Sequence, residues 1–268
     1  MKISAWHKAN GDEVYLNMPL FAQEKVYVSQ LFEWSKFNGL IHSIGGPGIE
    51  NTKSLPRHME AMKPDPYLFN LDYSLGYTFR YCPRKCSFCK VSEIEKDRQH
   101  YSIWNFHYSK FKKICLLNNN TFADPRWRET FEEIWDANLT VIDENGYDLR
   151  LLDEEKTEAL KKTKFQGTLH FAWDNIKDET KIKHGLNLLK QYKLNNPNTV
   201  VYVLIGYDTS EEEDIHRCQI IADYNMSVYP MPYVFNNYTK KFKRFMNLFY
   251  WRKMPSIKEA WEKYQGGV

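Results

Sequence analysis

The chain has 268 residues, of which 43% are hydrophobic, enough for one large folded domain with a small appendage. Its formal net charge of +3 at pH 7 is too small to indicate a nucleic-acid partner by itself. The first residues, Met1 to His7, lack the apolar core of a secretion signal, and no stretch approaches the ~18 uninterrupted apolar residues of a membrane helix. We therefore expect a cytoplasmic protein that has no membrane partner.

The first seventy residues alternate short strand-like and helix-like segments. We expect strands at residues 14–16, 25–28 and 40–44, with a helix at 31–37 between the last two. The last strand runs into Gly45-Gly46-Pro47-Gly48, which we interpret as a turn that needs positive φ. The pattern predicts a small α/β unit over residues 1–70.

From residue 73 onward, strand-like and helix-like segments alternate regularly, which predicts parallel βαβ units. The expected strands are 73–81, 113–118, 139–142 with an extended continuation at 147–150, 168–173, 199–205 and 226–231. The expected helices are 124–137 with Asp124 as its cap, 153–163, 178–195, and one that begins after a Ser210–Glu213 capping box. Six such units are too few for the ~250 residues of a full eightfold barrel, so we expect an open, partial one.

Three cysteines follow the first of these strands, with the spacing Cys-x-x-x-Cys-x-x-Cys. They are Cys82, Cys86 and Cys89, and Phe88 precedes the last. Three thiolates on one tight loop can hold three irons of a [4Fe-4S] cluster and leave the fourth iron open. A zinc site with His100 or Cys115 as fourth ligand is an alternative. A disulfide framework is disfavoured by the odd count of five cysteines and the absence of a visible signal peptide.

This spacing, directly after a strand, resembles the signature of the radical S-adenosylmethionine (radical SAM) superfamily. The resemblance implies an α/β chain with a partial (β/α)6 barrel over residues 71–235. A shortened, Rossmann-like domain similar to cobalamin-binding domains would precede it at 1–70, and a helical extension would follow at 236–268. In that family the open iron binds the amine and carboxylate of S-adenosylmethionine, and reductive cleavage yields a 5′-deoxyadenosyl radical. The electron comes from a donor such as flavodoxin or ferredoxin.

The resemblance also suggests roles for residues near the cofactor. Phe88 is expected near the adenine, and Gly206 resembles the small residue that lets adenine approach the fifth strand. Asn119 and Asn120 end the second strand, where many family members hold the methionine amine; a polar turn is the equal alternative.

Polar residues at the ends of the later strands are further candidates, because ligand-facing groups of barrels gather there. Arg150 suits the methionine carboxylate, since its planar fork pairs bidentately with carboxylates. Asp174 is expected to bind ribose hydroxyls or substrate, or else to cap the following helix. Asp148 also points toward the site by this rule.

Two further features set limits on cofactors. Cobalamin binding requires Asp-x-His-x-x-Gly, and the nearest candidate, His7, has Ala5 and Asn10 at the Asp and Gly positions, so we do not expect cobalamin to bind. Cys115 and Cys218 are expected to be buried structural thiols, too few for a second cluster.

The segment 240–253 mixes basic and aromatic residues. It fits an RNA or acidic-peptide contact. It also fits an amphipathic helix that closes the barrel with Phe242, Phe245 and Phe249 inward. The spacing of three and four residues between these phenylalanines favours the helix. We therefore predict a radical SAM enzyme whose substrate, a small molecule, a peptide or an RNA, stays open. The alternatives are a zinc-stabilised binding module and a catalytically idle iron–sulfur protein.

Overall fold

The computed structural model describes residues 1–18, 23–35, 37–49 and 54–266. Two four-stranded parallel sheets form its centre. The first has the order β3-β4-β5-β7, from β3 (Ser74–Gly76), β4 (Lys113–Leu116), β5 (Thr140–Ile142) and β7 (Lys164–Gln166). The second has the order β10-β9-β8-β6, from β6 (Tyr147–Asp148), β8 (Leu169–Trp173), β9 (Thr199–Ile205) and β10 (Ser227–Pro232). The chain is thus an α/β protein with parallel strands, as expected.

The two sheets are connected through consecutive strand pairs. β5 pairs with β7 and β6 pairs with β8, and Thr140↔Lys164 and Tyr147↔Phe171 are both separated by 24 residues. The register therefore continues unchanged across the two junctions, at residues 143–146 and 167–168. The strands occupy six successive positions, in which β5 and β6 share one position and β7 and β8 share the next.

The first junction is held by Asp143. Its carboxylate accepts hydrogen bonds from the backbone N of Gly146 at 3.0 Å and of His170 at 2.6 Å. Gly146 has φ +75°, and a Cβ there would lie 3.0 Å from the carbonyl oxygen of His170, so both its φ and its close approach favour glycine.

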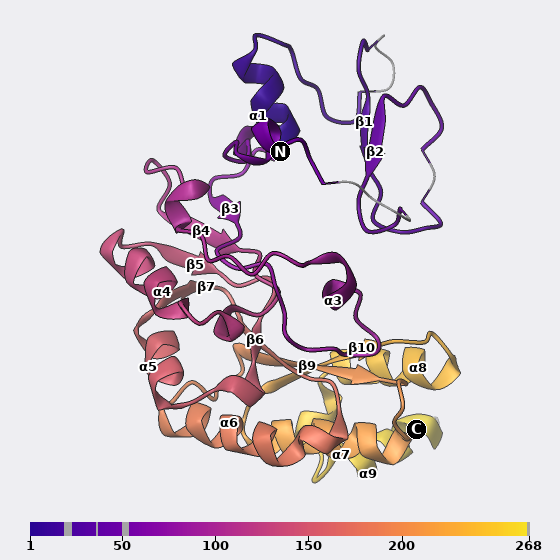
Figure 1. Cartoon of the computed structure of the whole chain (residues 1–268). Coiled ribbons are helices and arrows are strands. Elements are labelled where there is room, and N and C mark those ends of the chain that lie inside the picture. The colour runs from indigo at the N-terminus through magenta and orange to yellow at the C-terminus, as the bar shows by residue number, and fades with distance from the viewer. Residues whose placement is uncertain (19–22, 36, 50–53, 267–268) are drawn as a thin grey trace.

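Helices cover one side of the strands, as Figure 1 shows for α4, α5, α6 and α7 in succession. They are α4 (Trp127–Asp136), α5 (Glu154–Lys162), α6 (Glu179–Gln191) and α7 (Glu211–Asp223). Burial alternates along β9, and Val201, Val203 and Ile205 are fully buried in the core that these helices share. Removing each such side chain from water stabilises the fold by about 1.5–3 kcal/mol.

The expected C-terminal helix is present as α8 (Asn237–Asn247), followed by α9 (Ile257–Gly266). Phe242 and Phe245 are fully buried, as the spacing predicts. The prediction for Phe249 is wrong, because α8 ends at Asn247 and Phe249 adopts a left-handed conformation with its side chain 46% exposed.

The N-terminal region differs most from expectation. It contains α1 (Lys2–Ala9), the parallel pair β1 (Tyr27–Ser29) and β2 (Ser43–Gly45), and α2 (Arg57–Glu60). The helix expected at 31–37 is wrong for residues 31–35 and 37, and Lys36 lies outside the described residues; residues 14–16 form no strand. Gly46 has φ +111°, which the predicted turn requires.

Two boundaries in the sheet region are also corrected. The strand expected at 73–81 is shortened to β3, and Asp124 does not cap α4, which begins at Trp127. Asp124 instead binds His100 at 2.6 Å and accepts a hydrogen bond from the backbone N of Arg126 at 2.9 Å. The Ser210–Glu213 capping box at the start of α7 is confirmed.

A buried ion pair lies beneath the ends of β8 and β9. Arg217 and Asp214, both on α7 and both with fully buried side chains, pair at 2.6 Å. Arg217 also donates to the carbonyl oxygens of Trp173 at 3.0 Å and Leu204 at 2.6 Å, at the ends of the two strands. We expect Asp214→Ala to lower the free energy of unfolding by about 3–5 kcal/mol in urea titrations, because it leaves a buried guanidinium unpaired.

Asp223→Ala is the matched control on the same helix, where the carboxylate is exposed. It should change stability by no more than about 0.5 kcal/mol. Equal effects of the two substitutions would contradict the assigned role of the ion pair.

The junction at Asp143 predicts a pH dependence of stability. The hydrogen bond and charge of Asp143 raise the pKa of His170 above its ordinary value, against the effect of burial. A raised folded-state pKa stabilises the fold fully below the unfolded pKa of about 6.5, and that stabilisation is lost as pH rises through the folded pKa. His170→Gln should therefore destabilise more at about pH 5.5 than at about pH 8.5 in urea titrations. Equal destabilisation at the two pH values would contradict the assigned role of Asp143.

Candidate metal centre at the cysteine loop

The residues before the cysteines are held by the buried side chain of Asn118. Its Oδ1 accepts hydrogen bonds from the backbone N of Thr78 at 2.9 Å and of Phe79 at 3.0 Å. Its Nδ2 donates to Oγ1 of Thr78 at 2.8 Å. One asparagine after β4 thus fixes the segment between β3 and the loop. Asn118 ends the strand expected at 113–118, and only its neighbours Asn119 and Asn120 were expected to have a role in the site.

The three cysteines are half-buried and unpaired with one another by disulfides. The backbone N of Cys89 donates to the carbonyl oxygen of Cys86 at 3.0 Å, which closes the loop into a tight turn. Burial raises the pKa of the Cys86 thiol, and the charge of Arg150 opposes that shift. Asp174, Cys89 and Cys82 raise this pKa further, so all of these groups lie within electrostatic reach of Cys86.

Asp148 anchors the loop to the sheet. This carboxylate, at the end of β6, is 7% exposed and accepts from Nε of Arg84 at 3.1 Å, and Arg84 lies between Cys82 and Cys86. It also accepts from Nδ2 of Asn120 at 3.2 Å and from Nε of Arg150 at 2.7 Å. Burial alone would raise the pKa of Asp148, but the hydrogen bond and charge of Arg150, helped by Arg84, hold it below its ordinary value.

Asn120 presents an unsatisfied polar atom beside the cysteines. Its side chain is 5% exposed, and its Nδ2 lies 3.9 Å from Sγ of Cys82. Its Oδ1 has no hydrogen-bond partner among the described residues, although buried polar atoms are normally paired. Asn119 is different, because its Nδ2 donates to the carbonyl oxygen of Arg80 at 2.6 Å and holds the backbone of the loop.

Arg150 and Asp174, the two charged candidates, differ in how far other side chains already bind them. The guanidinium of Arg150 is held by Asp148 and, through Nη1 at 2.8 Å, by Asp178, so a ligand carboxylate must compete with them. Asp174 caps no helix, since the side chain of Asn175 accepts from the backbone N of Lys177 in that position. Its carboxylate makes no side-chain hydrogen bond within the described part of the chain, and burial raises its pKa.

Aromatic contacts hold the other side of the loop against the last two strands. The hydroxyl of Tyr207, after β9, donates to Oγ of Ser87 at 2.6 Å, and its ring packs edge-on against Phe88 at 5.4 Å. Tyr233, after β10, packs against Tyr207 at 4.6 Å. The loop between β3 and α3 (Val91–Ile94) therefore extends across to the ends of β9 and β10 (Figure 1).

The conformation and packing of Gly206 favour glycine at this position without any bound cofactor. It has φ +69°, and a Cβ there would lie 2.7 Å from Cγ2 of Thr239 on α8. Its expected contact with adenine stays a prediction.

His100 and Cys115, the two possible fourth ligands of a zinc site, have other roles in the structure. His100 is engaged by Asp124, as described above, and Cys115 is buried on β4, where burial raises its pKa to about 12. In the described ranges, no three His, Cys, Asp or Glu side chains are arranged to hold a single metal ion.

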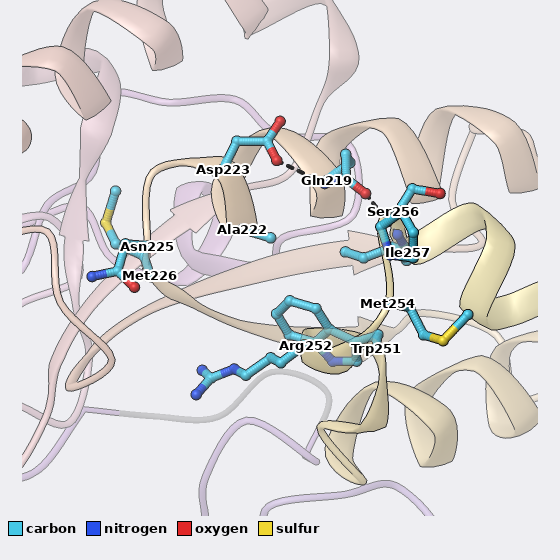
Figure 2. Close-up of a pocket in the computed structure, with 11 residues that line it drawn as sticks. Gln219, Ala222, Asp223, Asn225, Met226, Trp251, Arg252, Met254, Ser256 and Ile257 are labelled. Carbon is cyan, nitrogen blue, oxygen red and sulfur yellow. Dashed lines mark hydrogen bonds between the residues drawn. The ribbon is translucent and has the colours of Figure 1, made fainter.

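A separate cavity of about 300 Å³ lies near the start of β10, between α7 and α9 (Figure 2). Asn225 and Met226 line it at the amino end of that strand, and Trp251 and Ile257 line it from the C-terminal extension. The cysteine loop contacts Tyr207 at the carboxyl end of β9, which is parallel to β10, so this cavity at the amino end of β10 is not part of the cysteine site.

Comparisons with known proteins found no match to this chain among family models, curated proteins or solved structures. No helix within the described residues is long and apolar enough to span a membrane.

The burial pattern predicts which thiols react. We expect iodoacetamide at about pH 8 to modify Cys82, Cys86 and Cys89 in reduced, metal-free protein, because they are half-buried. Cys115 and Cys218 should stay unmodified until denaturant is added, because both are buried, at 2% and 0% exposure, and the reagent cannot reach them in the folded protein. Peptide mass spectrometry would show this order, and early modification of Cys115 would contradict it.

Proposed function

We propose that the protein is a radical SAM enzyme whose [4Fe-4S] cluster is held by Cys82, Cys86 and Cys89. The observation that carries this proposal is the donor set: three free, half-buried thiols on one short loop, beside the ends of parallel strands. The unpaired Oδ1 of buried Asn120, next to Cys82, fits a site that a bound group completes. Three cysteines also fit a cluster with one iron left open.

When bound, the cluster would pass one electron to S-adenosylmethionine, breaking its C5′–S bond to give methionine and a 5′-deoxyadenosyl radical that abstracts hydrogen from the substrate. The electron would come from a reductant of the flavodoxin or ferredoxin type. The protein's own share is to hold the reactants in position and to exclude water.

The residues around the loop are suited to holding S-adenosylmethionine in position. Oδ1 of Asn120 can accept a hydrogen bond from the methionine ammonium, since it has no partner among the described residues. Asp174, also without a side-chain hydrogen bond there, can accept from ribose hydroxyls or from substrate. Arg150 can bind the methionine carboxylate if that group displaces Asp178, while Asp148 keeps the guanidinium in place. Phe88, packed on Tyr207, and Gly206 would lie beside the adenine.

The architecture supports the same proposal. Six successive positions of parallel strands fit a partial (β/α)6 barrel over residues 71–235, with candidate ligands at the carboxyl ends of several strands. The parallel β1–β2 pair fits a reduced Rossmann-like unit over residues 1–70. Both ring nitrogens of His7 are hydrogen-bonded, to Asp12 at 2.6 Å and Tyr27 at 3.0 Å, so cobalt ligation would require breaking one of these bonds. We place the enzyme in the reducing cytoplasm, where a [4Fe-4S] cluster and free thiols persist.

Turnover of S-adenosylmethionine tests the proposal. After anaerobic reconstitution with iron and sulfide and reduction with dithionite, the parent protein should release 5′-deoxyadenosine, measured by liquid chromatography. Cys86→Ala should release none above the reagent blank, because one iron loses its ligand.

Cys115→Ala is the matched control, since this buried thiol lies on β4, and it should keep both the cluster and the activity. A bound zinc with no visible absorbance would instead identify a binding module. A stable cluster that gives no product would identify an idle iron–sulfur protein. Either result would contradict the proposed enzyme.

A further inference from the structure

The C-terminal part of the chain concentrates positive charge that forms no ion pair within the described residues. Residues 224–258 contain seven Lys and Arg and no Asp or Glu, although the whole chain carries a net charge of only +3. The basic residues are Lys240, Lys241, Lys243, Arg244, Arg252, Lys253 and Lys258. Among the described residues, no ion pair involves any of them. No carboxylate in the described part of the chain therefore pairs with these charges, although Arg252 donates to Oγ of Ser227 at 2.7 Å.

On α8, basic side chains and apolar side chains lie on different faces of the helix. Phe242, Phe245 and Met246 are fully buried. Lys240 and Arg244 are exposed on the other side of the helix. The helix therefore presents a basic outer surface, and its apolar side is already used by the core.

Exposed aromatic side chains lie at both ends of this surface. Tyr233 and Phe235 are 48% and 64% exposed just before α8, and Phe249 and Tyr250 are 46% and 49% exposed just after it. Between them, the ammonium of Lys243 lies 4.8 Å from the ring centre of Tyr229 on β10. The basic stretch of α8 thus has exposed rings at both of its ends, and we name residues 233–253 the α8 track.

The α8 track is continuous with the cysteine loop. Tyr233 packs against Tyr207, and Tyr207 contacts both Phe88 and Ser87 of the loop. From there α8, with 11 residues, extends the track by roughly 16 Å at 1.5 Å per residue. A polymer lying on the track would have one end beside the proposed reaction centre.

We infer that the α8 track binds a single-stranded nucleic acid, and that this polymer is the substrate of the proposed enzyme; the second part rests on the proposed function. Basic side chains that follow the phosphate backbone, with aromatic rings on which bases stack, are the usual means of binding single strands. An anionic membrane fits less well, because an amphipathic helix enters a bilayer with its apolar face, and that face of α8 is buried.

Fluorescence anisotropy with a labelled oligouridine RNA and the matching DNA, on reconstituted protein at several salt concentrations, tests the inference. The variant Lys240→Gln, Lys241→Gln, Lys243→Gln, Arg244→Gln should bind at least about tenfold more weakly. The slope of its log affinity against log salt should become less negative by about 3, because each phosphate contact on a single strand contributes about 0.7 to its magnitude. Glutamine keeps the helix propensity of these positions.

The matched control is Lys112→Gln, Lys161→Gln, Lys181→Gln, Lys190→Gln, which removes the same charge from exposed lysines on other elements. It should bind as the parent does. A second variant, Phe249→Ala with Tyr250→Ala, should weaken binding by about tenfold per ring without changing the salt slope.

Five outcomes separate the possibilities. Loss in the track variants alone supports the inference, whether RNA or DNA binds more tightly. Equal loss in the control, or binding to vesicles of anionic phospholipid but to neither oligonucleotide, overturns it. Nucleic-acid binding without 5′-deoxyadenosine would leave the track as a binding surface and reject the enzyme. Turnover without such binding would reject the track alone.

Discussion

The buried carboxylate of Asp148 is the contact on which the candidate site depends. It joins Arg84 of the cysteine loop to Asn120 after β4 and to Arg150 two residues further along its own segment. A carboxylate that is 7% exposed is stable as an ion only when such partners surround it, so the loop, the strand end and the arginine are held together. Arg150 extends the network to Asp178 at the start of α6.

Two other groups of contacts fix the frame around that network. Asn118 holds the backbone of Thr78 and Phe79 at the entrance to the loop. Arg217 and Asp214 hold the ends of β8 and β9 from below, and Asp214 also accepts a hydrogen bond from the hydroxyl of Tyr238 on α8 at 3.0 Å. The loop therefore rests on strand ends that buried polar groups hold firmly. This kind of support is needed where reacting groups must keep their positions.

Much of the fold could be predicted, because its signals are local. β9 coincides with the predicted strand, since six of its seven residues are apolar or aromatic and suit a strand buried on its helix-covered face. Ser210 with Glu213 marks the start of α7. The inward positions of Phe242 and Phe245 follow from their spacing. Phe249 departs from that spacing because the helix ends before it, at Asn247. The helix predicted at 31–37 failed, and Phe32 and Trp34 there are half or more exposed and stack on one another instead of on a core.

The candidate site, like the fold, could be predicted only where the signal is local in the sequence. Spacing alone identified the three cysteines, and the rule for strand ends identified Asp148, Arg150 and Asp174 as candidates. The partners of Asp148 could not be predicted, because Arg84 lies 64 residues away in the chain and their contact depends on how the loop crosses the sheet. Likewise, the pairing of His100 with Asp124 replaces a local cap by a distant contact. Pairings across the fold carry no periodicity, so only the structure shows them.

Electron paramagnetic resonance of the reduced, reconstituted protein tests the central claim most directly, because it reports whether the cluster has an open iron that S-adenosylmethionine reaches. We predict a [4Fe-4S]⁺ signal whose g values shift when S-adenosylmethionine is added, in the parent and in Cys115→Ala but not in Cys86→Ala. A cluster signal that S-adenosylmethionine leaves unchanged, or no cluster signal at all, would contradict the account.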